Sequence, residues 1–300
     1  MPFEPLSFKE PVNRWVEQLV TQYGDTLHGF SALILQGLLL PIEQALRAAP
    51  AWLILLLVLA LAWHATRSLW RAGALTAALS LIGLVGLWDA LMQTLAITLV
   101  ATGFTVLIGL PLGILMARYA RLRAVLLPLL DVMQTLPSFV YLIPVLMLFG
   151  LGKVPAIMAT LVYALPPLMR LTDLGIRQVN AELLEAAWSF GTTPWQLLVS
   201  VQLPQALPSI MAGINQCLMM ALSMVVIASM IGARGLGEEV LTGIQTLDFG
   251  RGLQAGLAIV ILAIVLDRIT QAYGVRAFKE TPGRSQVSLA PSGGPGGGVS

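Results

Sequence analysis

Residues 92–117 read MQTLAITLVATGFTVLIGLPLGILMA, a run of 26 residues without a charged side chain. Hydrocarbon offers no partners for backbone N–H and C=O groups. A segment that crosses a bilayer is therefore a helix of about 20 mostly apolar residues, or a strand of a closed barrel. This run has the length and the composition of such a helix. It predicts one membrane-spanning helix, and the rest of the chain repeats the pattern.

Six further stretches of the same character flank this run, at about 50–66, 70–88, 124–149, 155–172, 208–231 and 253–273. We therefore expect an all-α polytopic membrane protein with about seven transmembrane helices. Prolines interrupt two stretches, which helices packed in a membrane tolerate; these are Pro137, Pro144, Pro166 and Pro167. The spacings Gly109/Gly113 and Gly252/Gly256 would allow close helix packing, although a chain with 28 glycines produces such spacings by chance.

The overall composition points the same way. Hydrophobic residues make up 57% of the 300 residues and charged residues only 11%, whereas a soluble domain carries about 25% charged residues. The single cysteine, Cys217, excludes an internal disulfide, and with two histidines a Cys/His metal site is implausible. The net charge of +2 is spread along the chain, which argues against nucleic-acid binding.

Residues 29–46 are a weaker candidate for a span, because they include Glu43 and other polar residues. A charge near the bilayer centre costs roughly 2.5–3.5 kcal/mol, whereas apolar residues recur here at helical spacing. We expect an amphipathic helix in contact with membrane lipid at the interface, with an eighth span as the alternative. The chain then divides into an N-terminal tail with this helix (1–49), a transmembrane domain (50–276) and a disordered Gly/Pro/Ser-rich tail (277–300).

Basic residues predict the orientation, because lysine and arginine concentrate on the cytoplasmic side. With seven spans and the N-terminus outside, the inner side receives eleven of them: Arg67, Arg71, Arg118, Arg121, Arg123, Arg170, Arg177, Arg268, Arg276, Lys279 and Arg284. The outer side receives six: Lys9, Arg14, Arg47, Lys153, Arg234 and Arg251. We therefore expect a cytoplasmic C-terminus. The start of the chain lacks a basic segment followed by an apolar run, so no cleaved signal peptide is expected.

A long, partly polar segment on the predicted inner side, residues 178–207, contains the most specific motif. It reads Glu185-Ala186-Ala187, three residues, Gly191, nine residues, then Val201-Gln202-Leu203-Pro204. This resembles the EAA loop of membrane subunits in binding-protein-dependent ABC importers, Glu-Ala-Ala-x3-Gly-x9-Ile-x-Leu-Pro, from which only Val201 departs.

The residues of this segment predict two short helices joined by a turn. Residues 181–190 favour a helix that Gly191 can end, and Thr193 with Pro194 is a typical helix start. Such a helix can lie in a groove of a soluble partner; the alternative is packing against the protein's own spans. The resemblance implies that the partner is the ATPase and that the coupling residues are Glu185, Ala186, Ala187, Gly191, Pro194, Trp195, Leu203 and Pro204.

Four further strings narrow the resemblance: residues 131–144, 149–155, 164–167 and 221–230. They are similar to the permease subunit of glycine betaine/proline betaine ABC importers. The resemblance implies the MetI-like fold of type I ABC importer transmembrane domains in a bacterial inner membrane. It further implies two permease copies, identical to each other, two ATPase subunits that use ATP and Mg²⁺, and an extracytoplasmic substrate-binding protein.

The chain itself has no recognisable catalytic motif. Gly152-Lys153 lacks the preceding glycine and the following Ser/Thr of a phosphate-binding loop, so ATP hydrolysis must come from another chain. We expect no enzyme activity, no bound cofactor and no metal.

Polar residues within spans are candidates for the translocation pathway. Asp131, Gln134, Thr135 and Ser138 recur at helical spacing, Asn215 lies in another span, and Phe139 and Tyr141 could offer cation–π attraction to a quaternary ammonium solute. The alternative is that these polar groups bond across helices, that Asp131 pairs with an arginine, and that the aromatic rings only pack.

Other functions remain open at this point. The same architecture could carry choline, carnitine or proline, and the sequence does not separate these cargoes. An ion-gradient secondary transporter would show inverted repeats and a charged midplane site, for which we find little support. A non-transporting membrane scaffold is a further alternative.

Overall fold

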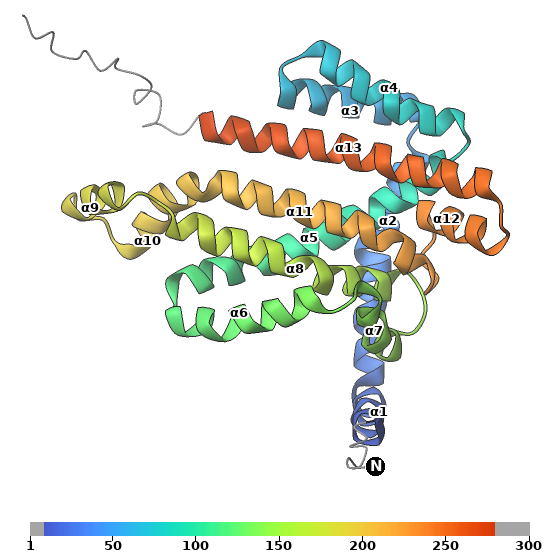
Figure 1. Cartoon of the computed structure of the whole chain (residues 1–300), viewed down its shortest axis with the longest axis horizontal. Helices are drawn as coiled ribbons and strands as arrows, with labels where there is room; N and C mark the ends of the chain where they lie inside the picture. Colours follow the sequence, from blue (N-terminus) through green and yellow to red (C-terminus); the bar gives the residue numbers. More distant parts are fainter. Residues whose placement is uncertain (1–8, 280–300) are drawn as a thin grey trace, which may run out of the picture.

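The computed structural model describes residues 9–279, and every regular element in that range is a helix (Figure 1). In chain order these are α1 Lys9–Ile34, η1 Leu35–Leu39, α2 Leu40–Ala48, α3 Ala51–Thr66, α4 Leu69–Leu84, α5 Trp88–Arg118, α6 Ala120–Thr135, η2 Ser138–Tyr141, α7 Leu142–Phe149, α8 Lys153–Arg177, α9 Ala181–Ser189, α10 Pro194–Leu197, η3 Leu198–Gln202, α11 Leu203–Ser229, α12 Leu236–Gln245 and α13 Phe249–Lys279. The expected all-α class is confirmed. The tail expected at 277–300 lies outside the described residues except for its first three positions.

A bundle of long helices forms the centre, with α8 packed between α5 and α11 and with α13 alongside α11 (Figure 1). Small residues permit these close approaches. A Cβ atom on Gly113 of α5 would lie 2.7 Å from the Thr172 Cβ of α8, and one on Gly109 would lie 3.0 Å from Leu168. The first small-residue pattern is thus a true packing surface, whereas Gly256 of the second faces open space.

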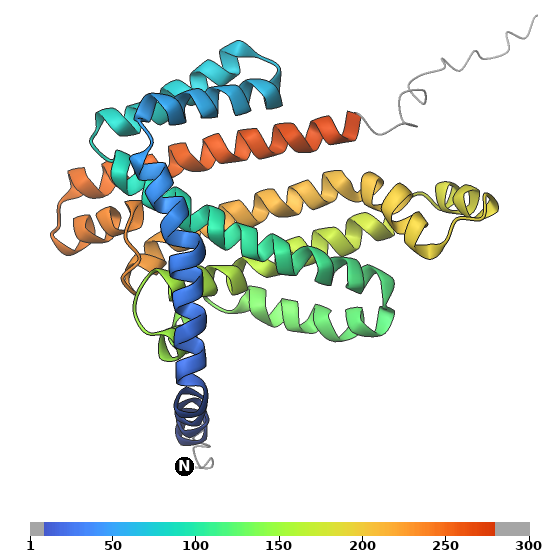
Figure 2. The ribbon, with the colours of Figure 1, turned by 180° about the vertical axis from the view of Figure 1, so that it is seen from behind.

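Five helices of the described residues 9–279 are long and apolar enough to cross a membrane: Val20–Ala48, Trp88–Arg118, Lys153–Arg177, Pro194–Ser229 and Phe249–Gly274. A sixth candidate is the broken pair of α6 with residues 138–149, which is bent by 110°. The sequence predicted about seven spans. Two predicted spans, α3 and α4, have only 16 residues each and pair as a hairpin beside α13 (Figures 1 and 2). One candidate, Val20–Ala48, was not among the seven.

The bend after α6 has a local cause. Proline restricts the residue before it to extended backbone, and Leu136, which precedes Pro137, has φ −69° and ψ 133°. The stretch predicted as one helix over 124–149 is therefore two helices. Pro144, in the first turn of α7, and the pair Pro166-Pro167 inside α8 interrupt neither helix.

The N-terminal arm, which we define as α1, η1 and α2, is one continuous helix that lies across the bundle (Figures 1 and 2). Its π turn over 35–39 adds one residue to a helical turn, so that the spacing between residues on one face becomes five instead of four. As a result Ile34, Leu39 and Glu43, each at most 3% exposed, share one buried face. The crosswise direction suits an interfacial helix, while the length and composition of Val20–Ala48 also suit a span; the interfacial placement of 29–46 stays a prediction.

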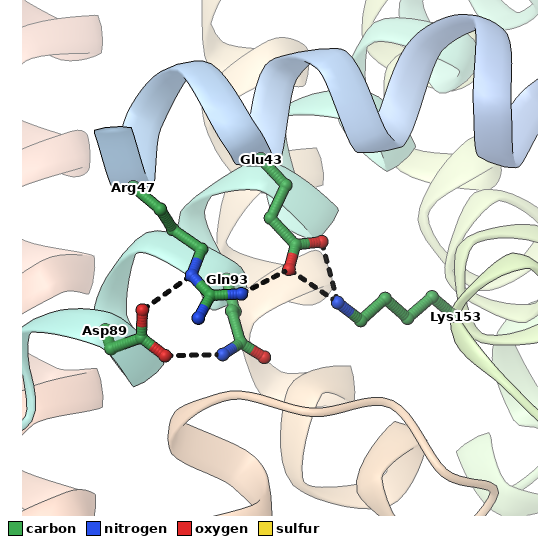
Figure 3. A network of polar contacts seen from close by, with 5 residues as sticks. All are labelled: Glu43, Arg47, Asp89, Gln93 and Lys153. Carbon is green, nitrogen blue, oxygen red and sulfur yellow. Dashed lines mark hydrogen bonds and ion pairs between the residues drawn. The ribbon is translucent and has the colours of Figure 1, made fainter. Parts of the chain in front are cut away.

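An ionic network with the buried Glu43 at its centre joins the N-terminal arm to the bundle (Figure 3). The Nζ atom of Lys153, at the start of α8, lies 2.7 Å from both carboxylate oxygens of Glu43. Arg47 Nη1 lies 3.5 Å from Glu43 Oε1, and Arg47 Nε lies 2.6 Å from Asp89 Oδ1 at the start of α5. Gln93 Nε2 donates to the other oxygen of Asp89 at 2.9 Å. The charges of the two carboxylates and the two cations cancel. The carboxylate of Glu43 can therefore be buried, at 3% exposure, because it has cationic partners.

The two ends of the bundle differ in the segments they carry (Figure 1). The α5–α6 turn with Arg118 and Arg123, the α9–α10 segment and the end of α13 lie at one end. The ionic network, α12 and the starts of α5 and α8 lie at the other. This grouping matches the sides to which the sequence analysis assigned these segments.

Candidate functional site

The motif residues Glu185, Ala186 and Ala187 lie on α9, at one tip of the bundle (Figure 1). The helix begins where the Asn180 side chain accepts a hydrogen bond from the Glu182 N–H at 2.9 Å, a typical N-cap. Ala187 is buried, while Glu185 and Ala186 are exposed. The predicted helix over 181–190 is confirmed to within one residue.

The turn after α9 depends on the backbone conformation of Gly191. Its φ is +75°, in the region that residues with a Cβ avoid, although no atom lies within 4 Å of where a Cβ would stand. The next residue, Thr192, donates from both its N–H and its hydroxyl to the carbonyl of Ala187, at 3.3 and 2.9 Å. Glycine is therefore needed here for its conformation and not for space.

A capping box starts the second helix. The Thr193 N–H donates to Gln196 Oε1 at 2.8 Å, and the Gln196 N–H donates to Thr193 Oγ1 at 3.4 Å. Pro194 occupies the first helical turn, where its missing N–H does no harm. The predicted helix start is confirmed.

This second helix continues without a break into α11, so that Pro194–Ser229 is one helix of 36 residues. The continuation passes the Leu203-Pro204 step through the π turn η3, where the Leu203 N–H bonds to the carbonyl of Leu198, five residues back. Within 178–207 the helix thus extends beyond the two predicted short helices, through η3 into α11. A displacement of its tip would be transmitted directly along a candidate membrane span.

We call α9 through η3 (residues 181–202) the coupling segment, and its two faces differ. On the inner face Ala187, Leu197 and Leu198 are buried, and a pocket of about 240 Å³ separates the segment from the ends of α5 and α8. On the outer face two aromatic side chains are exposed, Phe190 by 90% and Trp195 by 68%. Trp188 is 50% exposed but also lines the pocket, so it lies at the edge of this face. Exposed apolar groups gathered at one tip are typical of a surface that binds a partner.

The predicted pathway residues fall into two groups. Asp131, Gln134, Thr135 and Phe139 are exposed and Ser138 is half-buried. The Asp131 carboxylate accepts a hydrogen bond from Arg170 Nη2, so the predicted pairing with an arginine is present.

Tyr141 and Asn215 lie elsewhere. Tyr141 is 7% exposed, its hydroxyl donates to the carbonyl of Met133, and its ring packs 6.1 Å from that of Tyr163. Asn215 Nδ2 donates to Asp267 of α13 at 2.8 Å, and its Oδ1 accepts from Thr270 at 2.5 Å. Both side chains hold elements of this chain together, as the alternative in the sequence analysis has it, and their place on the pathway stays a prediction.

The sequence analysis missed several charged partners. Asp173 is buried and pairs with Arg123 at 2.9 Å across α6 and α8, and Glu43 pairs with Lys153, 110 positions away. Only the presence of these residues in apolar stretches signalled that partners must exist. Among residues 9–279, no three His, Cys, Asp or Glu side chains gather in a way that could hold a metal.

Comparison with known proteins identifies the family to which the chain belongs. The family model described as "Binding-protein-dependent transport system inner membrane component" matches residues 109–278, which include α6, α8 and the whole coupling segment. The chain belongs to this family. It is a membrane-embedded permease subunit of an ABC importer, with the MetI-like fold that the sequence predicted.

Two relatives and one solved structure resemble this permease over most of its length. It is 48% identical over 271 residues to the glycine betaine/proline betaine transport system permease protein ProW of Escherichia coli (strain K12), covering 88% of this chain and 75% of that protein. It is 44% identical over 276 residues to the glycine betaine/carnitine transport permease protein GbuB of Listeria monocytogenes, covering 90% and 98%. A structure of the inward-facing MetNI methionine ABC transporter matches with a TM-score of 0.54 and 25% identity, over 64% of this chain and 94% of that chain.

Proposed function

We propose that this permease carries glycine betaine, a quaternary ammonium zwitterion, into the cytoplasm as part of an ATP-driven importer. The observation that carries the proposal is the similarity to ProW and GbuB over about nine tenths of the chain. Proline betaine is a second cargo of the same class, because the name of ProW includes it, and carnitine is the alternative that the name of GbuB includes. Membership in a binding-protein-dependent family argues against the ion-gradient alternative.

The energy source in this proposal is a separate ATPase subunit, which binds the outer face of the coupling segment. The exposed rings of Phe190 and Trp195 supply apolar contact area, and short helices of this kind suit a groove on a soluble partner. Two permease copies and two ATPase subunits form the complex, and an extracytoplasmic binding protein delivers the solute. This arrangement places the coupling segment in the cytoplasm and the ionic network on the outer side.

Coupling follows from the continuity of the helix Pro194–Ser229. When ATP draws the two ATPase subunits together, the two coupling segments approach each other and each carries its α11 along as a rigid body. The pathway then changes from inward-open to outward-open, which requires two packings whose balance the nucleotide shifts.

The test is reconstitution in lipid vesicles with the cognate ATPase subunit and binding protein. ATP-dependent accumulation of radiolabelled glycine betaine, unaffected by an uncoupler, is the expected result. Accumulation that continues without ATP and stops with the uncoupler would contradict the proposal, and so would failure of the ATPase subunit to co-purify.

A further inference from the structure

Two ion pairs join α6 to α8, and they differ in their exposure. In the pair Arg123–Asp173 the aspartate side chain is only 5% exposed, so this pair lies inside the helix contact. In the pair Asp131–Arg170 the aspartate side chain is 65% exposed and the arginine 31%. The second pair therefore lies on an open face of the chain.

That open face cannot be in contact with lipid tails without a large penalty. Both residues belong to candidate spans, and charged groups within spans face a bundle interior or water because hydrocarbon solvates them poorly. Gln134 and Thr135, one turn further along α6, are exposed as well. The face that carries Asp131 and Arg170 therefore borders water or another protein surface within the membrane.

The ion pair leaves hydrogen-bonding capacity unused. A guanidinium has five N–H donors, yet within the described residues Arg170 Nη2 bonds only to Asp131, and the buried Nε of Arg170 has no partner. A planar guanidinium is suited to bind a carboxylate with two parallel hydrogen bonds.

We infer that Asp131 and Arg170 form a binding station for a zwitterionic solute within the permease itself. This inference rests on the proposed function. The solute carboxylate binds the guanidinium of Arg170, and the solute ammonium group lies against the Asp131 carboxylate. Glycine betaine carries both charges one carbon apart. When it binds, Asp131 and Arg170 exchange their contact with each other for one contact each with the solute, and the two side chains move apart to admit the bulky trimethylammonium group. The station stays electrically neutral with the solute bound or absent.

Neutrality gives the station its selectivity. A solute with a quaternary ammonium group but no carboxylate, such as choline, would compete for Asp131 and leave the Arg170 guanidinium, whose Nε is buried, without a carboxylate partner. The station thus favours zwitterions over simple cations, in addition to whatever selection the binding protein makes.

The test makes the same substitution in both ion pairs. Arg170→Lys and Arg123→Lys each keep the positive charge between α6 and α8 but remove the planar fork. We would measure initial rates of ATP-driven glycine betaine uptake by the complete reconstituted importer at saturating, solute-loaded binding protein. We expect Arg170→Lys to lower the rate at least fivefold and Arg123→Lys to leave it within twofold of the wild type. Equal effects of the two substitutions would overturn the inference.

A second measurement does not depend on altering the charges. Cys217 is fully buried, so a cysteine introduced by Gln134→Cys gives a single reactive thiol one turn from Asp131. We expect glycine betaine to slow its alkylation at least threefold and choline to leave the rate unchanged. Alkylation that neither solute affects, or that both slow equally, would overturn the station. Failure of the wild-type importer to take up glycine betaine would instead overturn the proposed function, and the station with it.

Discussion

Replacing Glu43 by glutamine should destabilise the permease far more than a change at an exposed ion pair. The substitution leaves the Lys153 ammonium, whose side chain is 17% exposed, without its carboxylate partner at 2.7 Å (Figure 3). Removing one partner of a buried pair costs about 3–5 kcal/mol, because the remaining charge is left uncompensated. We expect the lower end, about 3 kcal/mol, since Lys153 keeps some contact with water.

The reverse substitution, Lys153→Met, should cost less. Glu43 then keeps Arg47, whose Nη1 lies 3.5 Å from its carboxylate, and we expect a loss of about 2 kcal/mol. The double variant Glu43→Gln/Lys153→Met leaves neither charge uncompensated. It should therefore be more stable than the sum of the single losses predicts, by about 2 kcal/mol of coupling energy.

Thermal unfolding of the purified protein in detergent measures these effects. At roughly 2–4 °C per kcal/mol, Glu43→Gln should lower the Tm by roughly 6–12 °C. Glu239→Gln is the matched control, because it breaks the more exposed Arg251–Glu239 pair, also 2.7 Å apart, and should change the Tm little. The reasoning is refuted if Glu43→Gln is no more harmful than Glu239→Gln, or if the two single effects simply add.

Four further substitutions test the coupling segment and the bundle. Gly191→Pro and Glu185→Lys should each abolish uptake while the protein still inserts into the membrane. The first substitution alters the turn, which needs φ +75°, and the second reverses a charge on the exposed face that binds the partner. Immunoblots of membranes measure insertion and transport assays measure uptake; normal solute accumulation would contradict the coupling role. Thr193→Ala removes the capping box and should cost about 1 kcal/mol, seen as a lower affinity for the ATPase subunit but an unchanged amount of inserted protein. Gly113→Val should lower the Tm by several degrees, because even a Cβ would lie 2.7 Å from Thr172; an unchanged Tm would mean that α5 and α8 do not pack as described.

Local signals in the sequence predicted the coupling segment well. The turn at Gly191 and the cap at Thr193 depend on residues within five positions, and both appear as predicted. The continuation through Leu203-Pro204 was missed, because a proline after a polar stretch suggests an interruption. The π turn that accommodates it leaves no mark in the residue pattern.

The identity of long-range partners could not be predicted, although an arginine partner for Asp131 was expected. Glu43 and Lys153 are 110 positions apart, and Asp131 and Arg170 are 39 apart. Which residues pair depends on how the helices pack, and the sequence gives the order of the helices along the chain but not their arrangement in space. The same holds for Gly109 and Gly113, whose spacing is common by chance but whose contact with α8 is specific.

The central claim is that the tip of the coupling segment binds a separate ATPase subunit on the cytoplasmic side of the membrane. Trp195→Cys tests it most directly, because Trp195 is 68% exposed and Cys217 is fully buried. A membrane-impermeant maleimide should label this cysteine in inside-out vesicles but not in spheroplasts, and added ATPase subunit should protect it. Labelling from the outer side, or labelling at an unchanged rate with the ATPase subunit bound, would contradict the claim.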